Sequence, residues 1–112
     1  MALITVSSVP GQTATAVAAA AVSASDTLAA ADIGTNGVLL NVINGSGGSI
    51  NVTIADPGTT AVGNVGTTAA QAVANGADRW FRILPGHVNA ATGVATVTYS
   101  GTTSVTYKAL KA

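Results

Sequence analysis

The side chains of this chain that could carry acid–base chemistry belong to one histidine and four aspartates. General acid–base catalysis needs a positioned side chain that exchanges a proton with the substrate. The candidates are His87, Asp26, Asp32, Asp56 and Asp78, and we expect all of them in turns or at strand ends. His87 stands between Pro85-Gly86 and Asn89, which is typical of a loop or interface histidine, and no nucleophile-elbow spacing is present. The sequence therefore predicts no catalytic residue and a protein that is not an enzyme.

Metal and cofactor sites also lack their usual residues. The chain has no cysteine and a single histidine, so it cannot supply a zinc shell of cysteine and histidine ligands, and its aspartates are not at EF-hand spacing. Residues 45–48 are glycine-rich, but a P-loop requires a lysine and a following helix, whereas a strand is expected here. Asp56 precedes Pro57-Gly58, so we expect its carboxylate to accept hydrogen bonds from downstream amides. We predict no metal, no cofactor and no small-molecule substrate.

The most distinctive segment surrounds the only tryptophan. In Arg79-Trp80-Phe81-Arg82, the alternation of a strand cannot bury both aromatic rings in one core, so one ring faces outward or towards a partner. Tryptophan and arginine are enriched at the hot spots of protein interfaces. We therefore predict that Trp80, Arg79, Arg82 and His87 belong to an interface. The alternative is that Trp80 caps the open end of the fold.

The low charge of the chain favours association with other proteins. Of its 112 residues, 48% are hydrophobic and only 7% are charged, and glutamate is absent. An ordinary soluble domain has about 25% charged residues. A surface of threonine, serine, asparagine, glycine and alanine costs little to desolvate. The composition predicts a folded chain that is surrounded by neighbouring subunits; the alternative is an extracellular module with an uncharged surface.

Nucleic acid and membrane are not expected partners. The net charge is +0, and the four basic residues, Arg79, Arg82, Lys108 and Lys111, look too thinly spread to bind a phosphate backbone. The N-terminal residues lack the basic start and the continuous apolar run of a secretion signal. Residues 14–31 are apolar, but Ser23, Asp26 and other polar residues interrupt them, and a membrane helix needs about 20 mostly apolar residues. We expect a soluble protein that is synthesised in the cytoplasm.

Short apolar runs between glycines predict strands and turns throughout the chain. Three hairpins are expected: residues 38–44 with 49–55, residues 68–74 with 78–84, and residues 95–99 with 105–109. Matching the apolar faces pairs Leu40 with Val52 and Tyr99 with Val105, which requires loops of odd length. Between the second pair of strands, Asn75-Gly76 is a strong hairpin signal, with positive φ expected at both residues.

The N-terminal third gives weaker signals. Residues 3–6 predict an edge strand, whereas residues 14–25 fit a helix by alanine propensity or a strand of small residues, and we favour the strand. The chain as a whole predicts an all-β fold, a single β-sandwich or jelly roll of about seven to eight short antiparallel strands. Residues 1–12 form an N-terminal arm or edge strand, and residues 13–112 form the β-sandwich domain.

Several segments from about Gly37 onward carry a likeness to a known group of proteins. They are Asn44-Gly45-Ser46-Gly47-Gly48-Ser49-Ile50-Asn51-Val52-Thr53 leading to Asp56-Pro57-Gly58, residues 74–79, Val94-Ala95-Thr96-Val97-Thr98-Tyr99, and Thr103-Ser104-Val105-Thr106. In these strands and turns the chain resembles the small virion proteins of tailed bacteriophages, the group that contains capsid decoration or cement proteins.

This resemblance implies a structural role. It implies a β-sandwich that binds the outer surface of an assembled phage head, often as a trimer over junctions between major capsid proteins, and clamps the subunits together. The major capsid protein and further copies of the chain would then be its partners, and the exterior of the virion its location. Two alternatives stay open: a phage tail or fibre component, and a carbohydrate-binding β-sandwich that uses Trp80.

Overall fold

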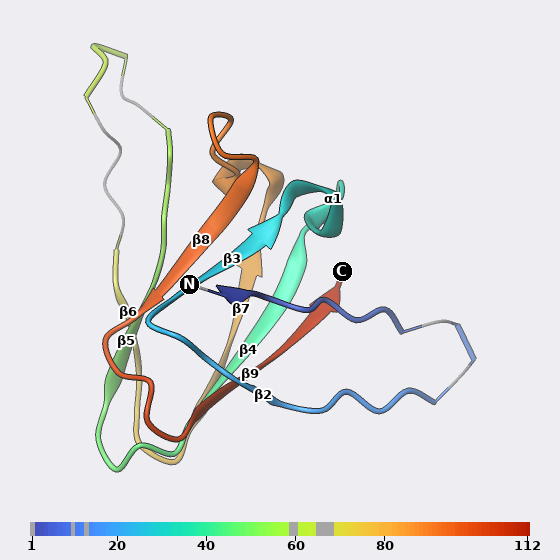
Figure 1. Ribbon diagram of the computed structural model, residues 1–112, viewed down its shortest axis with the longest axis vertical. Helices are drawn as coiled ribbons and strands as arrows, with labels where there is room; N and C mark the ends of the chain where they lie inside the picture. The colour runs from blue at the N-terminus through green and yellow to red at the C-terminus, as the bar shows by residue number, and fades with distance from the viewer. Residues whose placement is uncertain (1, 10, 13, 59–60, 65–68) are drawn as a thin grey trace.

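The alternating segments fold into two sheets that face each other. The computed structural model describes residues 2–9, 11–12, 14–58, 61–64 and 69–112 (Figure 1). Sheet A has the strand order β1 (Ala2–Leu3), β3 (Ser25–Ala29), β8 (Val94–Tyr99), β5 (Ile50–Ile54), β6 (Gln71–Val73). Sheet B has the order β2 (Ala20–Ala21), β9 (Val105–Lys111), β4 (Val38–Asn44), β7 (Asp78–Ile83). The predicted all-β sandwich is confirmed, with nine strands in the described part of the chain.

Two features of the architecture differ from the simplest antiparallel sandwich. The pairing of β1 with β3 is parallel, while the other strand pairs are antiparallel. Two short helical turns, α1 (Ala30–Ile33) and η1 (Pro85–His87), join strands of different sheets. Within the described residues, neither these turns nor any other helix has the length and apolarity needed to cross a membrane.

The core consists of the apolar faces that alternation predicts. Leu40 and Val42 of sheet B and Val52 and Val97 of sheet A each have 0% of their side-chain surface exposed. Burying one such side chain contributes about 1.5–3 kcal/mol to folding. The inner and outer faces of these strands are therefore as the sequence predicts.

The three predicted hairpins are wrong. Strands β4 and β5, β6 and β7, and β8 and β9 lie in different sheets, so each pair is joined by a connection that crosses the sandwich. Leu40 is in register with Phe81 and Ala109, and not with Val52. Among the described strands, β5 and β6 are the only consecutive ones that pair. Alternation determines which side chains face inward, but a following strand can bury the same face either beside its predecessor or opposite it.

The turn at Asn75-Gly76 is not the hairpin turn that was expected, because the strands that it joins lie in different sheets. Only Gly76 has a positive φ, of 76°, and the N–H of Ala77 donates to the carbonyl of Ala74 at 3.1 Å. A positive φ at the third residue alone is typical of a type II turn, whereas the type I′ hairpin turn expected for Asn-Gly needs it at both central residues. This turn carries the chain from β6 to β7 and thus between the sheets.

Asn44 connects the crossing turns, which gather at the lower end of the sandwich in Figure 1. Its side chain is 1% exposed. The amide Nδ2 donates to the carbonyls of Gly48 at 2.7 Å and Val73 at 2.9 Å, and Oδ1 accepts from the N–H of Ser46 at 3.0 Å. The next residue, Gly45, donates its N–H to the carbonyl of Ser104 at 3.0 Å. One buried amide therefore holds the end of β4 to the turn before β5 and to the end of β6.

The N-terminal segment lies largely outside the sandwich. β1 is at the edge of sheet A, as expected for an edge strand, and Ile4 is buried with 1% exposure. Residues 14–19 form no helix, and the favoured strand occurs only at Ala20–Ala21 and from Ser25 onward. Alanine side chains offer little area to bury, so pairing with β9 decides where this segment becomes a strand. Met1, Pro10 and Thr13 lie outside the described residues.

A polar cluster is enclosed between the sheets near β3. Asp26 is 1% exposed, and its carboxylate accepts hydrogen bonds from the backbone N–H and the hydroxyl of Ser23. The Tyr99 hydroxyl is buried and has no hydrogen-bond partner among the described residues. Burial, then the nearby Asp26 carboxylate and then Tyr107, raise the pKa of Tyr99. The Tyr107 hydroxyl, in contrast, accepts a hydrogen bond from the N–H of Thr5 at 3.2 Å.

Replacement of the buried amide should destabilise the whole sandwich. We expect Asn44→Ala to lower the free energy of unfolding by about 3 kcal/mol, because it removes the three hydrogen bonds that this buried amide makes. The matched control is Asn75→Ala, which removes one exposed hydrogen bond to the N–H of Gly47 and should cost less than about 1 kcal/mol. Urea unfolding of both variants measures the difference. Equal losses would show that Asn44 has no special role.

The buried Tyr99 hydroxyl should make stability fall at high pH. The ordinary pKa of tyrosine is about 10, so the folded state, with its raised pKa, holds the proton more tightly than the unfolded state above that pH. The resulting stability is complete below about pH 10 and is lost as the pH rises. Tyr99→Phe should remove this part of the alkaline loss and raise stability at pH 7 by about 1 kcal/mol.

Tyr107→Phe is the control for this prediction, because it removes a hydroxyl that has a hydrogen-bond partner. It should lower stability at pH 7 and keep the alkaline loss due to Tyr99. Denaturant titrations between pH 7 and about pH 11 compare the three proteins. An alkaline loss that Tyr99→Phe leaves unchanged would contradict the assignment.

Candidate functional site

A groove opens on one side of the sandwich between the edge strands of the two sheets. β6 is the last strand of sheet A and β7 is the last strand of sheet B on the same side. The groove has a volume of about 400 Å³ and is lined by Ile54, Gln71, Ala72, Arg79, Trp80, Phe81, Arg82 and His87. A smaller hollow of about 240 Å³ shares four of these residues and adds Val52, Asp56 and Ala69. We refer to the two together as the edge groove.

The edge groove brings together all four residues predicted at an interface: Arg79, Trp80, Arg82 and His87. Trp80 is 56% exposed, whereas Phe81 is partly buried and packs against the core. The prediction that one of the two rings faces outward is therefore confirmed, and the outward ring is that of Trp80. His87 reaches the groove from η1, the turn that follows β7.

Backbone carbonyls orient the two arginines. Arg79 Nη1 donates to the carbonyl of Asp78 at 2.7 Å, and Arg82 Nη1 donates to the carbonyl of Asn36 at 2.9 Å. A carbonyl is neutral, so these bonds hold the guanidinium groups without cancelling their charge. Each guanidinium has five N–H donors in a planar fork that matches a carboxylate.

Asn41 fixes β7 to the middle of sheet B directly beside Trp80. It lies opposite Trp80 in the register of β4 with β7 and is 4% exposed. Its Nδ2 donates to Asp78 Oδ2 at 2.8 Å and to the carbonyl of Arg79 at 3.3 Å. These bonds add to the backbone hydrogen bonds between β4 and β7, so both kinds of contact fix the strand that carries Trp80.

The acid–base candidates do not meet in one place. Asp26 lies inside β3 and is buried, so its expected position in a turn or at a strand end is wrong. Asp32 lies in α1, and Asp78 begins β7. Asp56 follows β5, and its Oδ1 accepts from the N–H of Gly58 at 2.9 Å, which confirms the predicted turn. Asp56 and His87 both line the smaller hollow.

The described residues do not form a metal site. No three His, Cys, Asp or Glu residues in the described segments are close enough together to hold a metal ion.

Sequence reasoning missed Ile54 and Gln71, which come to the groove from sheet A. The arrangement offers one aromatic surface, two guanidinium groups and an imidazole, which suits stacking and the binding of carboxylates.

Comparison with known proteins identifies no relative of this chain. No protein-family model matches the chain, and neither a curated protein nor a solved structure matches it.

The two aromatic residues of β7 should respond differently to truncation. Trp80→Ala should change the free energy of unfolding by less than about 1 kcal/mol, because most of the ring is already in solvent. Phe81→Ala should cost about 3 kcal/mol, because Phe81 packs on the core. Urea unfolding measures both. Trp80 is the only tryptophan, so its emission should also be quenched readily by acrylamide, and a shielded tryptophan would contradict the outward position.

Proposed function

We propose that this chain is a structural virion protein, a capsid decoration protein that binds the outer surface of an assembled bacteriophage head and stabilises it. Its partners are the major capsid protein and further copies of itself. The observation that carries the proposal is that the chain exposes apolar side chains on projecting segments that contain no charge. Such surfaces suit burial against other subunits.

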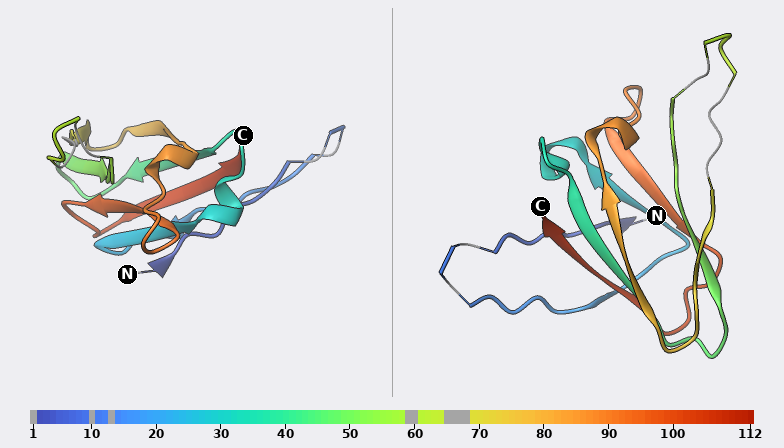
Figure 2. Two further views of the ribbon diagram at one scale, coloured as in Figure 1. Left: turned by 90° about the horizontal axis from the view of Figure 1, so that it is seen from above. Right: turned by 180° about the vertical axis from the view of Figure 1, so that it is seen from behind.

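The described residues of two segments extend away from the sandwich in Figure 1 and Figure 2. The first lies between β1 and β2 and the second between β5 and β6. Residues 5–25 and 57–70 contain no charged residue. Val9 in the first segment is 55% exposed, and Val62 in the second is 84% exposed. Removing these side chains from water at an interface is favourable, and no charge has to be desolvated with them.

The geometry of the projecting N-terminal segment supports a ring of copies. β1 and β2, which flank this segment, are the edge strands on one side of the sandwich, and the edge groove lies on the opposite side. A contact between unlike surfaces of successive copies closes into a ring when the rotation allows it. We favour a trimer, in which the N-terminal segment of one copy approaches the edge groove of the next.

Heads assembled with and without the chain test this proposal. In the phage that encodes the chain, we expect heads from a gene deletion to release DNA at a lower temperature than complete heads. Addition of the purified chain should restore the higher temperature, because it adds contacts between capsid subunits. Dye fluorescence measures DNA release, and electron cryo-microscopy locates the added density.

Three results would contradict the decoration role. Heads of equal stability without the chain would remove its mechanical function. Density on the tail would identify a tail or fibre component. Tight binding of a neutral glycan that is lost in Trp80→Ala would identify a carbohydrate-binding module, for which the exposed ring beside the edge groove is the favourable observation.

A further inference from the structure

The backbone of β7 alternates between groups that bond to β4 and groups that point away from the sheet. The N–H of Asn44 donates to the carbonyl of Ala77, at the start of the pairing between β4 and β7. In an antiparallel pair, residues that bond to the partner strand alternate with residues that do not. From Ala77 onward, the backbone groups that face β4 are therefore those of Arg79, Phe81 and Ile83, and those that face outward belong to Asp78, Trp80 and Arg82.

Side chains of the chain itself close both ends of this outer edge. At the start of β7, the carbonyl of Asp78 accepts a hydrogen bond from Arg79 Nη1 at 2.7 Å. Just after β7, the N–H of Leu84 donates to His87 Nδ1 at 2.9 Å. An added strand can therefore pair only with the middle of the edge.

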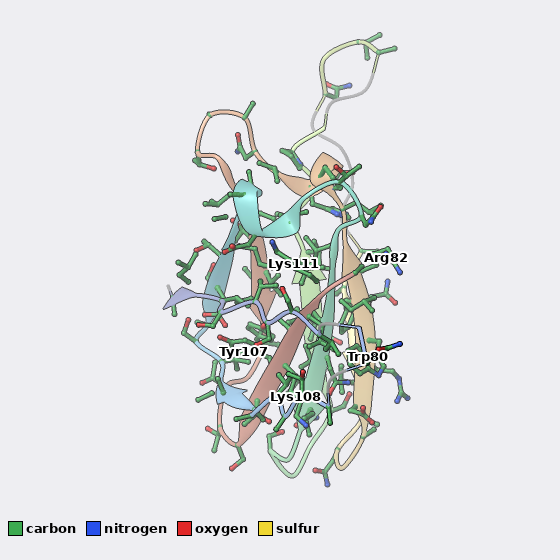
Figure 3. The ribbon with its side chains drawn as sticks, turned by 90° about the vertical axis from the view of Figure 1, so that its right-hand side faces the viewer. Trp80, Arg82, Tyr107, Lys108 and Lys111 are labelled. Atoms are coloured by element: carbon green, nitrogen blue, oxygen red, sulfur yellow. The ribbon has the colours of Figure 1, made fainter. Side chains whose placement is uncertain are left out.

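The middle of the edge is open. The N–H and C=O groups of Trp80 and Arg82 have no hydrogen-bond partner among the described residues, because β7 is the last strand of sheet B. Figure 3 shows both residues on β7, at one margin of the molecule. An extended segment of another chain can add to such an edge through main-chain hydrogen bonds.

The arginines of β7 leave this edge accessible. Charged side chains often protect an edge strand from pairing. Arg82 Nη1, however, is held by the carbonyl of Asn36, which precedes the neighbouring strand β4, so this guanidinium is directed back over sheet B. Arg79 closes only the carbonyl at the start of the strand.

The N-terminal segment is longer than its own fold requires. Ser7 lies beside Leu110, and Ala20 lies beside Tyr107, both on the outer edge of β9. Leu110 and Tyr107 are about 10 Å apart along the strand. Residues 8–19 connect the two contacts and could span about 40 Å when extended. Figure 2 shows the described ones reaching away from the sandwich, so the segment has the length to touch another copy.

Both ends of this segment already pair with the opposite edge of sheet B. The N–H of Ser7 donates to the carbonyl of Ala109 at 2.9 Å, and the N–H of Lys111 donates to the carbonyl of Ser7 at 2.9 Å. β2, at the other end, pairs antiparallel with β9. Residues 14–19 between them are uncharged, belong to no strand and are exposed except for the half-buried Val17. Covering them therefore requires no charge to be desolvated.

We propose that residues 14–19 of a second copy add as a strand to the open edge of β7, bonding to the backbone of Trp80 and Arg82. The inference rests on the proposed ring of copies and names the contact that builds it. Alternate side chains of the added strand face the edge groove beside Phe81, and alanine and Val17 are small enough for its volume of about 400 Å³. The donating segment and the receiving edge lie on opposite sides of sheet B, so the contact repeats head to tail and can close into a ring.

Proline substitutions in the full-length chain test this contact, because proline has no N–H. Ala16→Pro changes the donating segment where it belongs to no strand, and Arg82→Pro removes an outward N–H that β4 does not use. Each variant should weaken association at least about tenfold and stay monomeric in sedimentation velocity where wild type forms trimers. The matched control is Val62→Pro in the other projecting segment, which should associate like wild type.

A mixture of the two variants gives a sharper test. Ala16→Pro still offers an intact β7 edge, and Arg82→Pro still offers an intact segment, so one contact can form between them. We expect the mixture to give heterodimers and no trimers, at a higher concentration than wild type needs. Circular dichroism checks that each variant folds; if Arg82→Pro does not, the comparison of Ala16→Pro with Val62→Pro decides.

A monomeric wild type, or trimers that Ala16→Pro leaves intact, would overturn the strand addition. The same proteins are then added to heads that lack the chain. Trimers that respond to proline as expected but do not bind heads would contradict the decoration role and leave the contact between copies standing. If Arg82→Pro loses binding to heads while Ala16→Pro binds like wild type, β7 receives a strand of the capsid protein, and the second copy is the wrong occupant.

Discussion

The buried side chain of Asn44 joins the two sheets at the end of the sandwich where the chain crosses between them. A primary amide in an apolar interior is costly unless its donors and acceptor are bonded. Asn44 therefore keeps the carbonyls of Gly48 and Val73 close to the end of β4. β6 and β7 leave this junction as consecutive strands but become the edges of different sheets. The edge groove lies between them, and β7 with Trp80 begins directly at this junction, where the N–H of Asn44 donates to the carbonyl of Ala77 at 3.0 Å.

The fold class could be predicted from the sequence because alternation reports directly on burial. Val52, Val97 and Tyr107 all face the core as their spacing requires. The partners of the strands could not be predicted, because a strand that shares the apolar face of its predecessor can lie beside it or opposite it. Val97 and Tyr107 illustrate this: they belong to consecutive strands, yet they pack across the sandwich from sheet A and sheet B. The long-range pairing of β4 with β9 leaves no local signal in either segment.

The candidate site was predictable where its residues are neighbours in the chain. Arg79, Trp80 and Arg82 occupy one strand, and His87 follows in the next turn, so local reasoning was sufficient to group them. Ile54 and Gln71 join them only through sheet topology. For this reason the sequence indicated four scattered cations, whereas the fold places all of them on one sheet.

The two sheets present different side chains on their outer faces. Sheet A encloses Asp26 and presents hydroxyl groups outward, so it can face water or a neutral neighbour at little cost. Sheet B instead exposes the ring of Trp80, an apolar surface that is costly to leave in water. The register of sheet B places Arg82 and Lys108 on its outer face together with Trp80 and Asp78, whereas Arg79 and Lys111 share the inward-facing side with Val42 and Val38. The outer face therefore carries two cations and one carboxylate, so the exposed ring of Trp80, and not an excess of charge, distinguishes it from the hydroxyl-bearing outer face of sheet A.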